Sequence, residues 1–537
     1  DGSYGFSLDG GEPRPDPRSP WQPDGVHALS RPVDHAAFSW TDGAWPGRRL
    51  DGTSVIYELH PGTYSPEGTF DGAAARLDHL VDLGVDIVEL LPVNQFPGRW
   101  GWGYDGVDLF APHAAYGGPE GLKRLVDAAH GRGLAVVIDV VYNHLGPAGN
   151  YLREFGPYFT DRYSTPWGEA VNFDGSGSDE VREFVVGNAL MWLRDYHADG
   201  LRLDAVHAIL DTSATHILEE MAVRVSELAA EVGRLLFLVA ESDLNDPRVV
   251  REQEIGGYGV DAQWSDDFHH ALHSVLTGER AGYYADFGSL RDLAKSLRQA
   301  FVHDGDYSPF RGRRHGRRPT GLPATRFLGY LQNHDQVGNR AMGERSSMLI
   351  GPGMLKVGAA LVLLGPSVPM LFQGEEWGAS TPFQYFTDHE DAELGRLVSE
   401  GRRREFASFG WAPEDVPDPQ SEATFERSKL DWDEVGDPAH KDLLDWHRRL
   451  IALRRAEPAL SSGSSDDLDV RFDEDERWLV VDRDELSIAC NFAPEPRRVP
   501  GVTGELLVSS DDSVKVDADA VDLPPECVAV LRRRRPK

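Results

Sequence analysis

The sequence predicts an α/β protein: a (β/α)₈ TIM barrel with an extended loop after strand 3 and a C-terminal antiparallel β domain. From Ser54 onward, short apolar runs alternate with amphipathic stretches, which is the pattern of repeated βα units. Eight such runs follow one another, and several are almost wholly apolar, as in strands buried on both faces. From Asp466 the pattern changes to alternating polar and apolar residues, which is typical of antiparallel strands.

The predicted elements follow the chain in order. Strands are expected at 55–59, 87–91, 135–141, 200–203, 236–240, 262–264, 327–332 and 369–372. Helices are expected between them at 73–83, 118–132, 178–196, 212–232, 290–301 and 355–364, with a further helix at 443–456. Gly84 and Gly133 stand just before strands, where a helix commonly ends on glycine.

Three domains are expected. Residues 1–50 read as a remnant of an N-terminal β-sandwich plus a linker, because DGSYGFSLDGG resembles one strand and a turn and the Pro-rich stretch after it is extended. One strand cannot fold alone, so the rest of that sandwich is expected to be missing. Residues 51–460 form the catalytic barrel, with insertions at about 143–177 and 375–437, and residues 461–537 form the β domain.

Charge and composition exclude several classes of partner. The formal net charge of −34 argues against nucleic acid and anionic membranes, whereas a neutral ligand such as a sugar is not repelled. No apolar stretch is long enough to cross a bilayer, and the first residues lack a signal peptide, so a cytoplasmic protein is expected. Cys490 and Cys527 are too few for a disulfide framework and are expected to be free thiols rather than a pair.

Polar residues gather where predicted strands end. In a (β/α)₈ barrel the catalytic residues stand at the C-terminal ends of the strands. Strands three, four, five and seven end in DVVYNH, RLDAVH, AES and NHDQ. These motifs bring to one rim Asn143, His144, Arg202, Asp204, His207, Glu241, His334 and Asp335.

Three of these residues fit the cleavage of a glycosidic bond. Two carboxylates about 5–5.5 Å apart can cleave such a bond with retention, one attacking the anomeric carbon and one protonating the leaving oxygen. Arg202 lies two residues before Asp204 on the same strand face, so it is expected to keep Asp204 ionised as the nucleophile. Glu241 follows the apolar run LFLVA, where desolvation favours a protonated acid. Asp335 can oppose positive charge in the transition state.

These motifs resemble the four short signature regions of the α-amylase family, glycoside hydrolase family 13. DVVYNH, GLRLDAVH, VAES and NHD occur in the family's order. The resemblance implies that Asp204 is the nucleophile, Glu241 the acid/base and Asp335 the transition-state stabiliser. It also implies that the sugar at the cleavage point binds to Tyr104 and Asp105 in GWGYD, and to His144, Arg202 and His334.

Other segments resemble one branch of that family, whose members cut the α-1,4 bond next to a terminal trehalose and release trehalose and a maltooligosaccharide. These segments include WSDDFHHALHSVLTGERAGYYADFG and QNHDQVGNRAMGER. The branch acts after a maltooligosyltrehalose synthase, and its substrates are maltooligosyltrehalose and related α-glucans. The further substrate-binding residues expected are Trp102, His207, Asp266, His269, His270, Gln336, Asn339 and Arg340, with the DDFHH segment on the leaving-group side.

Several alternatives stay open. Taken alone, Asp204 could be only a salt-bridge partner of Arg202. Glu241 could be the residue that caps the start of a helix. Trp167 and Trp377 are weaker candidates for sugar contact. No cofactor and no metal are expected, although relatives often bind calcium at the Asn143 position. The competing functions are a branching enzyme, a debranching enzyme or a general α-amylase, and, from another class, a non-catalytic glucan-binding protein.

Overall fold

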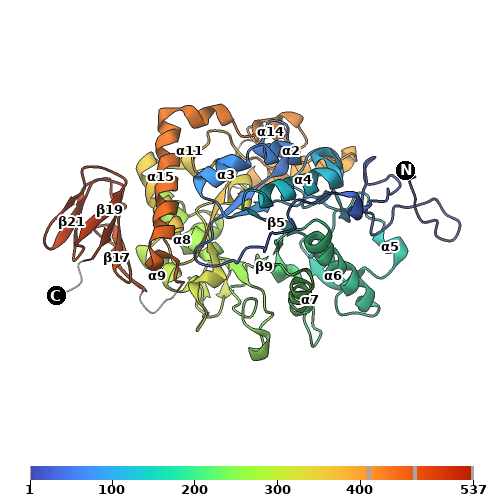
Figure 1. Ribbon diagram of the computed structural model, residues 1–537, viewed down its shortest axis with the longest axis horizontal. Coiled ribbons are helices and arrows are strands. Elements are labelled where there is room, and N and C mark those ends of the chain that lie inside the picture. The colour runs from blue at the N-terminus through green and yellow to red at the C-terminus, as the bar shows by residue number, and fades with distance from the viewer. Residues whose placement is uncertain (1, 408–411, 413, 464–467, 534–537) are drawn as a thin grey trace.

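The computed structural model describes residues 2–407, 412, 414–463 and 468–533, and its central element is a closed barrel of eight parallel strands (Figure 1). All eight predicted strands are confirmed. In chain order they are β1 (Ile56–Leu59), β2 (Ile87–Leu90), β5 (Ala135–Val140), β8 (Gly200–Leu203), β9 (Phe237–Ala240), β10 (Ala262–Trp264), β13 (Phe327–Gly329) and β14 (Val368–Phe372). Pairing of β1 with β14 closes the barrel.

The barrel interior changes from apolar to charged along the strands. Ile56, Ile87 and Val137 belong to one fully buried apolar cluster inside the barrel. Side chains two residues apart leave a strand on the same face. The next interior positions of β1, β2, β5 and β8 therefore form a buried charged layer towards the C-terminal end of the barrel, made of Glu58, Glu89, Asp139 and Arg202.

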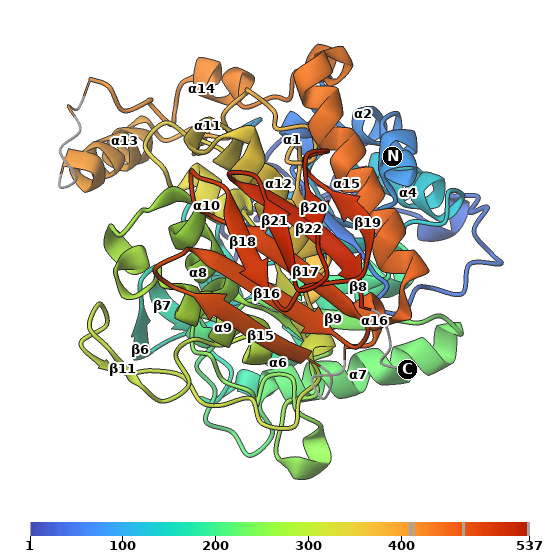
Figure 2. The same ribbon diagram turned by 90° about the vertical axis from the view of Figure 1, so that its left-hand side faces the viewer.

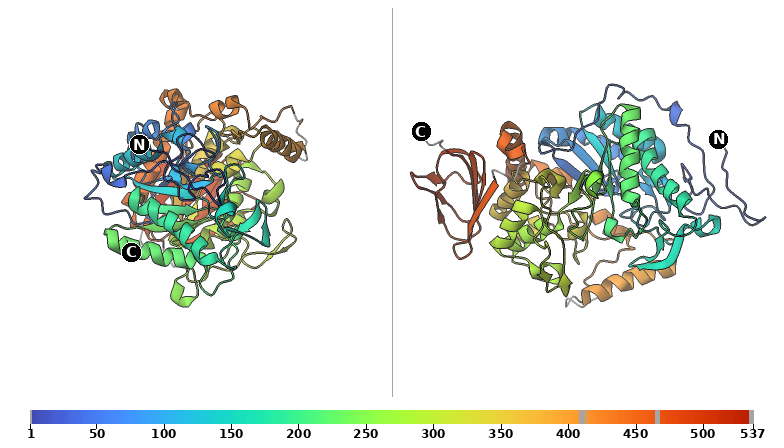
Figure 3. Two further views of the ribbon diagram at one scale, coloured as in Figure 1. Left: turned by 90° about the vertical axis from the view of Figure 1, so that its right-hand side faces the viewer. Right: turned by 90° about the horizontal axis from the view of Figure 1, so that it is seen from below.

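Helices cover the outside of the barrel (Figures 1 and 3). They are α2 (Phe70–Ala74), α3 (Leu77–Leu83), α4 (Gly118–His130), α6 (Ser178–Asp195), α7 (Ile217–Val232), α8 (Asp266–Thr277), α9 (Leu290–Gln299), α12 (Pro352–Leu363) and α15 (Pro438–Ala456). The helix predicted at 73–83 is split into α2 and α3, and the one predicted from residue 212 begins at Ile217, where the His216 side chain caps it.

Several helices were not predicted, and the longest of them are α8 and α13 (Ala392–Ala407). α8 follows β10 directly, and its polar, His-rich start hides its periodicity in the sequence. The insertion expected at about 375–437, for which no helix was predicted, contains α13 and α14 (Glu422–Arg427). α13 is largely charged, so it carries little apolar signal, and Figure 2 shows it at the periphery of the molecule.

Two excursions shape the rim. The long segment after β5 holds α5 (Leu152–Phe155) and a hairpin of β6 (Phe159–Thr165) and β7 (Gly168–Val171). A second antiparallel pair, β3 (Asn94–Gln95) and β4 (Asp108–Pro112), encloses the GWGYD motif. Both excursions leave the C-terminal ends of barrel strands, which is the end that carries the charged layer.

The N-terminal segment crosses the opposite end of the barrel. Trp45 donates its indole N–H to Asp199 (2.7 Å), which directly precedes β8, and the His130 ring lies between Asp199 (2.9 Å) and Asp42 (2.8 Å). The β-pairing of the described residues before Asp42 consists of isolated bridges, such as Tyr4 with Ser30. The assignment of residues 1–50 to a β-sandwich remnant plus linker stays a prediction, as do the other domain bounds.

The C-terminal β domain is antiparallel, as predicted, and lies at the end of the molecule away from the N-terminus (Figures 1 and 2). One sheet has the order β15 (Leu468–Asp473), β16 (Trp478–Arg483), β17 (Leu486–Asn491), β22 (Cys527–Arg532) and β19 (Glu505–Ser509). The other has the order β18 (Arg497–Pro500), β21 (Ala520–Leu523) and β20 (Lys515–Val516). Cys490 and Cys527 are buried free thiols, as expected. Within the described ranges, no helix is long and apolar enough to span a membrane.

Candidate active site

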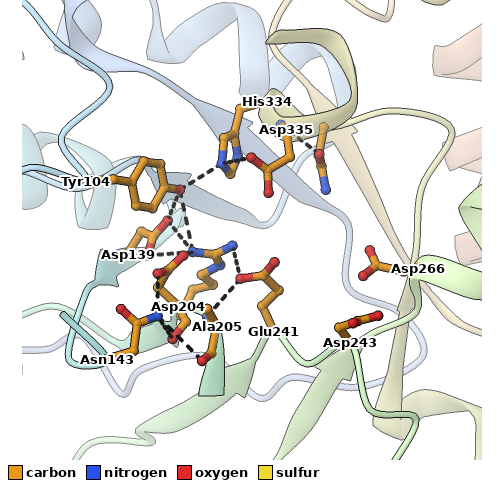
Figure 4. A network of polar contacts seen from close by, with 12 residues as sticks. Tyr104, Asp139, Asn143, Asp204, Ala205, Glu241, Asp243, Asp266, His334 and Asp335 are labelled. Carbon is orange, nitrogen blue, oxygen red and sulfur yellow. Dashed lines mark hydrogen bonds and ion pairs between the residues drawn. The ribbon is translucent and has the colours of Figure 1, made fainter. Parts of the chain in front are cut away.

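The three predicted catalytic carboxylates stand at one rim of the barrel (Figure 4). Asp204 follows β8 and Glu241 follows β9, and these two strands are hydrogen-bonded neighbours. Asp335 follows β13 as the second residue of a short helix, α10 (His334–Gly338), which Asn333 caps. The three side chains therefore come from separate elements that the closure of the barrel brings together.

Arg202 is the centre of the charge network. Its Nη1 donates to both oxygens of Asp139 (2.9 and 2.8 Å) and to Oδ1 of Asp204 (2.8 Å), and its Nη2 donates to Oε2 of Glu241 (2.9 Å). The side chain is fully buried and lies 4.4 Å from the centre of the Trp264 ring. One guanidinium thus links both carboxylates of the proposed acid and nucleophile pair, and its planar fork fixes their relative orientation.

Asp204 is held from two sides. Arg202 binds Oδ1, and the side-chain amide of Asn143 donates to Oδ2 (2.9 Å). Hydrogen bonds to both oxygens stabilise the ionised carboxylate. The other end of the Asn143 amide contacts the Nδ1 of His144, so both ends of the amide are engaged in this network.

The backbone beside Asp204 is adapted to Glu241. Ala205 has φ of +39°, in the left-handed region that non-glycine residues rarely adopt, and its N–H donates to Oε2 of Glu241 (2.8 Å). Both protein donors therefore use Oε2 and leave Oε1 available. Burial raises the pKa of Glu241 well above its usual value; Arg202 opposes this, while Asp204 and Asp335 add to it. These surroundings favour a protonated acid.

Tyr104 and His334 form the other wall of the site (Figure 4). The Tyr104 hydroxyl donates to Asp139 (2.6 Å) and lies 2.8 Å from Nε2 of His334. That Nε2 lies 3.5 Å from Oδ1 of Asp335. The two rings are stacked, with centres 5.3 Å apart. In this wall, His334 is therefore the residue that faces Asp335, and Tyr104 contacts the ring of His334 and Asp139.

Acidic residues extend the site beyond Glu241. Figure 4 shows Asp243 and Asp266 on the side of Glu241 away from Asn143. Tyr330 donates to Asp266 (2.5 Å). Burial raises the pKa of Asp266 to about 7, and nearby carboxylates such as Asp243 contribute. Asp243 pairs with Arg311 (2.9 Å), and its N–H lies 3.3 Å from the His207 ring.

The other residues predicted at the rim differ from one another in how far their side chains are exposed to solvent. Both ring nitrogens of His144 contact oxygen atoms of the protein, and the ring stacks on Trp167, whose side chain is 48% exposed (ring centres 4.7 Å apart). Trp102 is buried; its indole donates to a backbone carbonyl and it packs edge-on against His334. Asp105 is half-buried, and Trp377 is buried against the outer helices rather than at the rim.

The residues predicted after β10 and in α10 divide into inner and outer groups. His269 is fully buried and binds the Leu331 carbonyl (2.7 Å) and a tyrosine hydroxyl, so the structure places it beneath the site. His270 packs among aromatic rings. Gln336 accepts from the N–H of Asn333 and completes the α10 cap. Asn339 is exposed, and Arg340 pairs with Glu279 (2.9 Å). Their roles stay predictions.

Sequence reasoning did not assign roles to several residues of the network. Glu58, Glu89 and Asp139 are single acidic residues inside apolar strands, and that isolation is the signal that was available. Trp264 and Arg311 gave no such signal, because their partners Arg202 and Asp243 are distant in the sequence. In the described part of the chain, no group of three or more His, Cys, Asp or Glu residues is arranged to hold a metal ion.

Comparisons with known proteins agree with this architecture. Residues 36–164 match the family model described as alpha amylase, catalytic domain, and residues 463–530 match one described as a domain of unknown function. A Salmonella typhimurium protein assigned as an alpha amylase has a crystal structure with a TM-score of 0.91 and 39% identity, over 99% of this chain and 90% of that one.

Curated relatives extend the match over nearly the whole chain. The malto-oligosyltrehalose trehalohydrolase of Rhizobium sp. (strain M-11) is 54% identical, over 99% of this chain and 90% of the relative. That of Mycobacterium tuberculosis is 52% identical, over 100% of this chain and 93% of the relative. At this identity and coverage, the chain belongs to the malto-oligosyltrehalose trehalohydrolases, within the α-amylase family of glycoside hydrolases.

Proposed function

We propose that this protein is a retaining glycoside hydrolase that cleaves the α-1,4-glucosidic bond next to the terminal trehalose of maltooligosyltrehalose. The products are trehalose and a maltooligosaccharide. The observation that carries the chemistry is the single guanidinium of Arg202, which binds both Asp204 and Glu241. The observation that carries the substrate is the near full-length similarity to relatives named for this activity.

In the proposed mechanism, Asp204 attacks the anomeric carbon while Glu241 protonates the leaving oxygen. Because the protein donors to Glu241 both bind Oε2, the transferable proton sits on Oε1. Trehalose leaves with that proton, and a glycosyl ester forms on Asp204. Glu241, now a base, activates water, which cleaves the ester and restores both residues. Asp335 opposes the positive charge on the sugar ring during both steps.

The substrate-binding residues divide around this centre. Tyr104, His144 and His334 face the sugar that becomes attached to Asp204. Asp266 and His207 are proposed to bind the leaving trehalose, because they lie beyond Glu241. We further propose that the enzyme acts in the cytoplasm, on the product of a maltooligosyltrehalose synthase.

A related activity has one supporting observation. A 1,4-alpha-glucan branching enzyme from Vibrio parahaemolyticus is 35% identical, but over only 40% of this chain and 31% of that protein. That match covers shared barrel chemistry, and branching would require transfer to a second sugar chain instead of to water. A non-catalytic glucan-binding role is disfavoured because all three carboxylates are present and held in place.

Product analysis separates these functions. With maltotriosyltrehalose, we expect equal amounts of trehalose and maltotriose, and a kcat/KM about 10²-fold or more above that for maltopentaose. Proton NMR of the first turnovers should show the new reducing end in the α configuration, as retention requires. Equal cleavage of both substrates, or new α-1,6 bonds, would contradict the proposal.

A further inference from the structure

Two glutamates lie side by side beneath the proposed catalytic residues. Glu58 of β1 and Glu89 of β2 are Cα partners in the parallel pairing of these strands, so their side chains enter the barrel interior at the same level. Each is 1% exposed. Two neighbouring buried carboxylates cannot both be ionised without a large electrostatic cost. We therefore expect one of the two to be charged and the other to carry a proton.

Glu58 is the member with partners for a negative charge. Its Oε2 accepts the backbone N–H of His334 (3.0 Å), and its Oε1 lies 2.5 Å from Nδ1 of the same residue. The carboxylate thus binds the backbone and the ring of His334 together and fixes the orientation of the ring. No described residue forms a hydrogen bond with Oε2 of Glu89, and burial, with the charge of Glu58, raises the pKa of Glu89 well above its usual value.

The opposite side of the imidazole fixes its charge. The Tyr104 hydroxyl has one proton, and burial keeps its pKa well above the usual value. That proton points to Asp139, 2.6 Å away, so Nε2 of His334 must itself donate in its 2.8 Å contact with the Tyr104 oxygen. With Nδ1–H directed at Glu58, both nitrogens carry protons and the ring is an imidazolium.

The other charged groups around His334 agree with this state. Burial alone would lower the pKa of His334, but Glu58 and Asp335 raise it to about 9, against the opposing charge of Arg202. Glu89 and Asp139 also face this layer and interact with His334. On the side of β1, His60 is buried and neutral, because burial lowers its pKa to about 3.

We propose that Glu58 and Glu89 are a positioning pair for the active site: Glu58, as the carboxylate, holds His334 as an oriented imidazolium beside Asp335, and Glu89, as the protonated member, leaves the negative charge on Glu58. The inference rests on the proposed function in one respect, which is the reaction in which His334 takes part. The charge state of His334 is a property of the free protein and can be measured without substrate.

The test is an NMR titration of histidines labelled with ¹³C at Cε1, with His334 assigned by its loss in His334→Asn. In the wild type, His334 is expected to titrate at about pH 9. In Glu58→Gln, its midpoint should fall below that of a free histidine, about 6.5, because burial then dominates. In Glu89→Gln, the midpoint should stay near 9. The kcat of Glu58→Gln should fall about 10²-fold, as when one preorganised donor is lost.

A second buried glutamate provides the matched control. Glu376 is also fully buried and binds a histidine, His79 (2.7 Å), together with the Tyr57 hydroxyl, but on the outer side of β1. Glu376→Gln should lower the melting temperature without moving the His334 midpoint. If Glu58→Gln does not fold, Glu58→Asp retains the charge and should keep His334 protonated at neutral pH, with a lower kcat.

Three results would overturn the inference: a wild-type His334 that is neutral at pH 7, a midpoint that stays near 9 in Glu58→Gln, or one that falls as far in Glu89→Gln. The last would assign the charge to Glu89. Failure to release trehalose would instead overturn the proposed function, and it would leave the titration of His334 unchanged.

Discussion

Replacing Glu241 by glutamine is expected to lower kcat on maltotriosyltrehalose by about 10⁴-fold, or about 5.4 kcal/mol of activation free energy. Glutamine has the same shape as a protonated glutamic acid and can still accept from Arg202 and the Ala205 N–H through its oxygen. The fold should therefore persist while the proton donor is lost.

In the wild type, kcat/KM should fall as the pH rises past the elevated pKa of Glu241, and the variant should lack this decrease at alkaline pH.

The leaving group distinguishes loss of the acid from general damage. The fluoride ion of a maltooligosyl fluoride leaves with little protonation, so Glu241→Gln should show a much smaller defect in the first step on this substrate. Azide can attack the glycosyl ester without a base, so it should restore turnover and give an α-glycosyl azide as the product. Glu220→Gln is the control, because it breaks another Arg–Glu pair, with Arg182 (2.7 Å), on the outer helix α7. An equal defect on both substrates would contradict the acid role.

Asp204→Asn is expected to cause a still larger loss, of about 10⁵-fold or more in kcat, because an amide cannot form the glycosyl ester. A 5-fluoro maltosyl fluoride should accumulate that ester in the wild type. Mass spectrometry of the peptides should then find the label on Asp204, and find no label in the variant. Arg202 would retain Asp139 and Glu241 as partners, so the site should remain assembled.

The matched control for Asp204 lies at the other end of the same strand. Asp199 precedes β8, is fully buried and binds His130 and Trp45. Asp199→Asn should reduce stability but keep kcat within about threefold, since charged groups at the N-terminal face of such a barrel support the fold and lie away from the chemistry. A label on Asp335, or products of inverted configuration, would overturn the assignment of Asp204.

The barrel was predictable because its strands are short, continuous runs of apolar residues. The run at 135–141 reports burial on both faces, and the structure confirms it as β5. The charged helix α13 was not predicted in this way. α13 carries many Arg and Glu residues and packs few apolar side chains, so its periodicity does not separate it from an irregular insertion.

The site was predictable where the chemistry follows a strand and less so where it depends on register. Asp204 and Glu241 each come directly after a strand, which a single sequence reveals. A role for Glu58 and Glu89 can be inferred only once β1 and β2 are known to pair in register. The contact of Arg202 with Glu241 likewise requires that β8 lies beside β9. Such neighbours are set by how the barrel closes, and no local pattern encodes them.

The shared guanidinium has a consequence for the order of events in one turnover. Burial above all raises the pKa of Glu241, Arg202 lowers it, and the charge of Asp204 raises it again. On the proposed mechanism, that last charge disappears when Asp204 becomes an ester, and Arg202 then has one carboxylate fewer to neutralise. The pKa of Glu241 must fall at the moment when it has to accept a proton from water, and it rises again when the sugar leaves. The loss and return of the charge on Asp204 thus shift Glu241 from acid to base and back within one turnover.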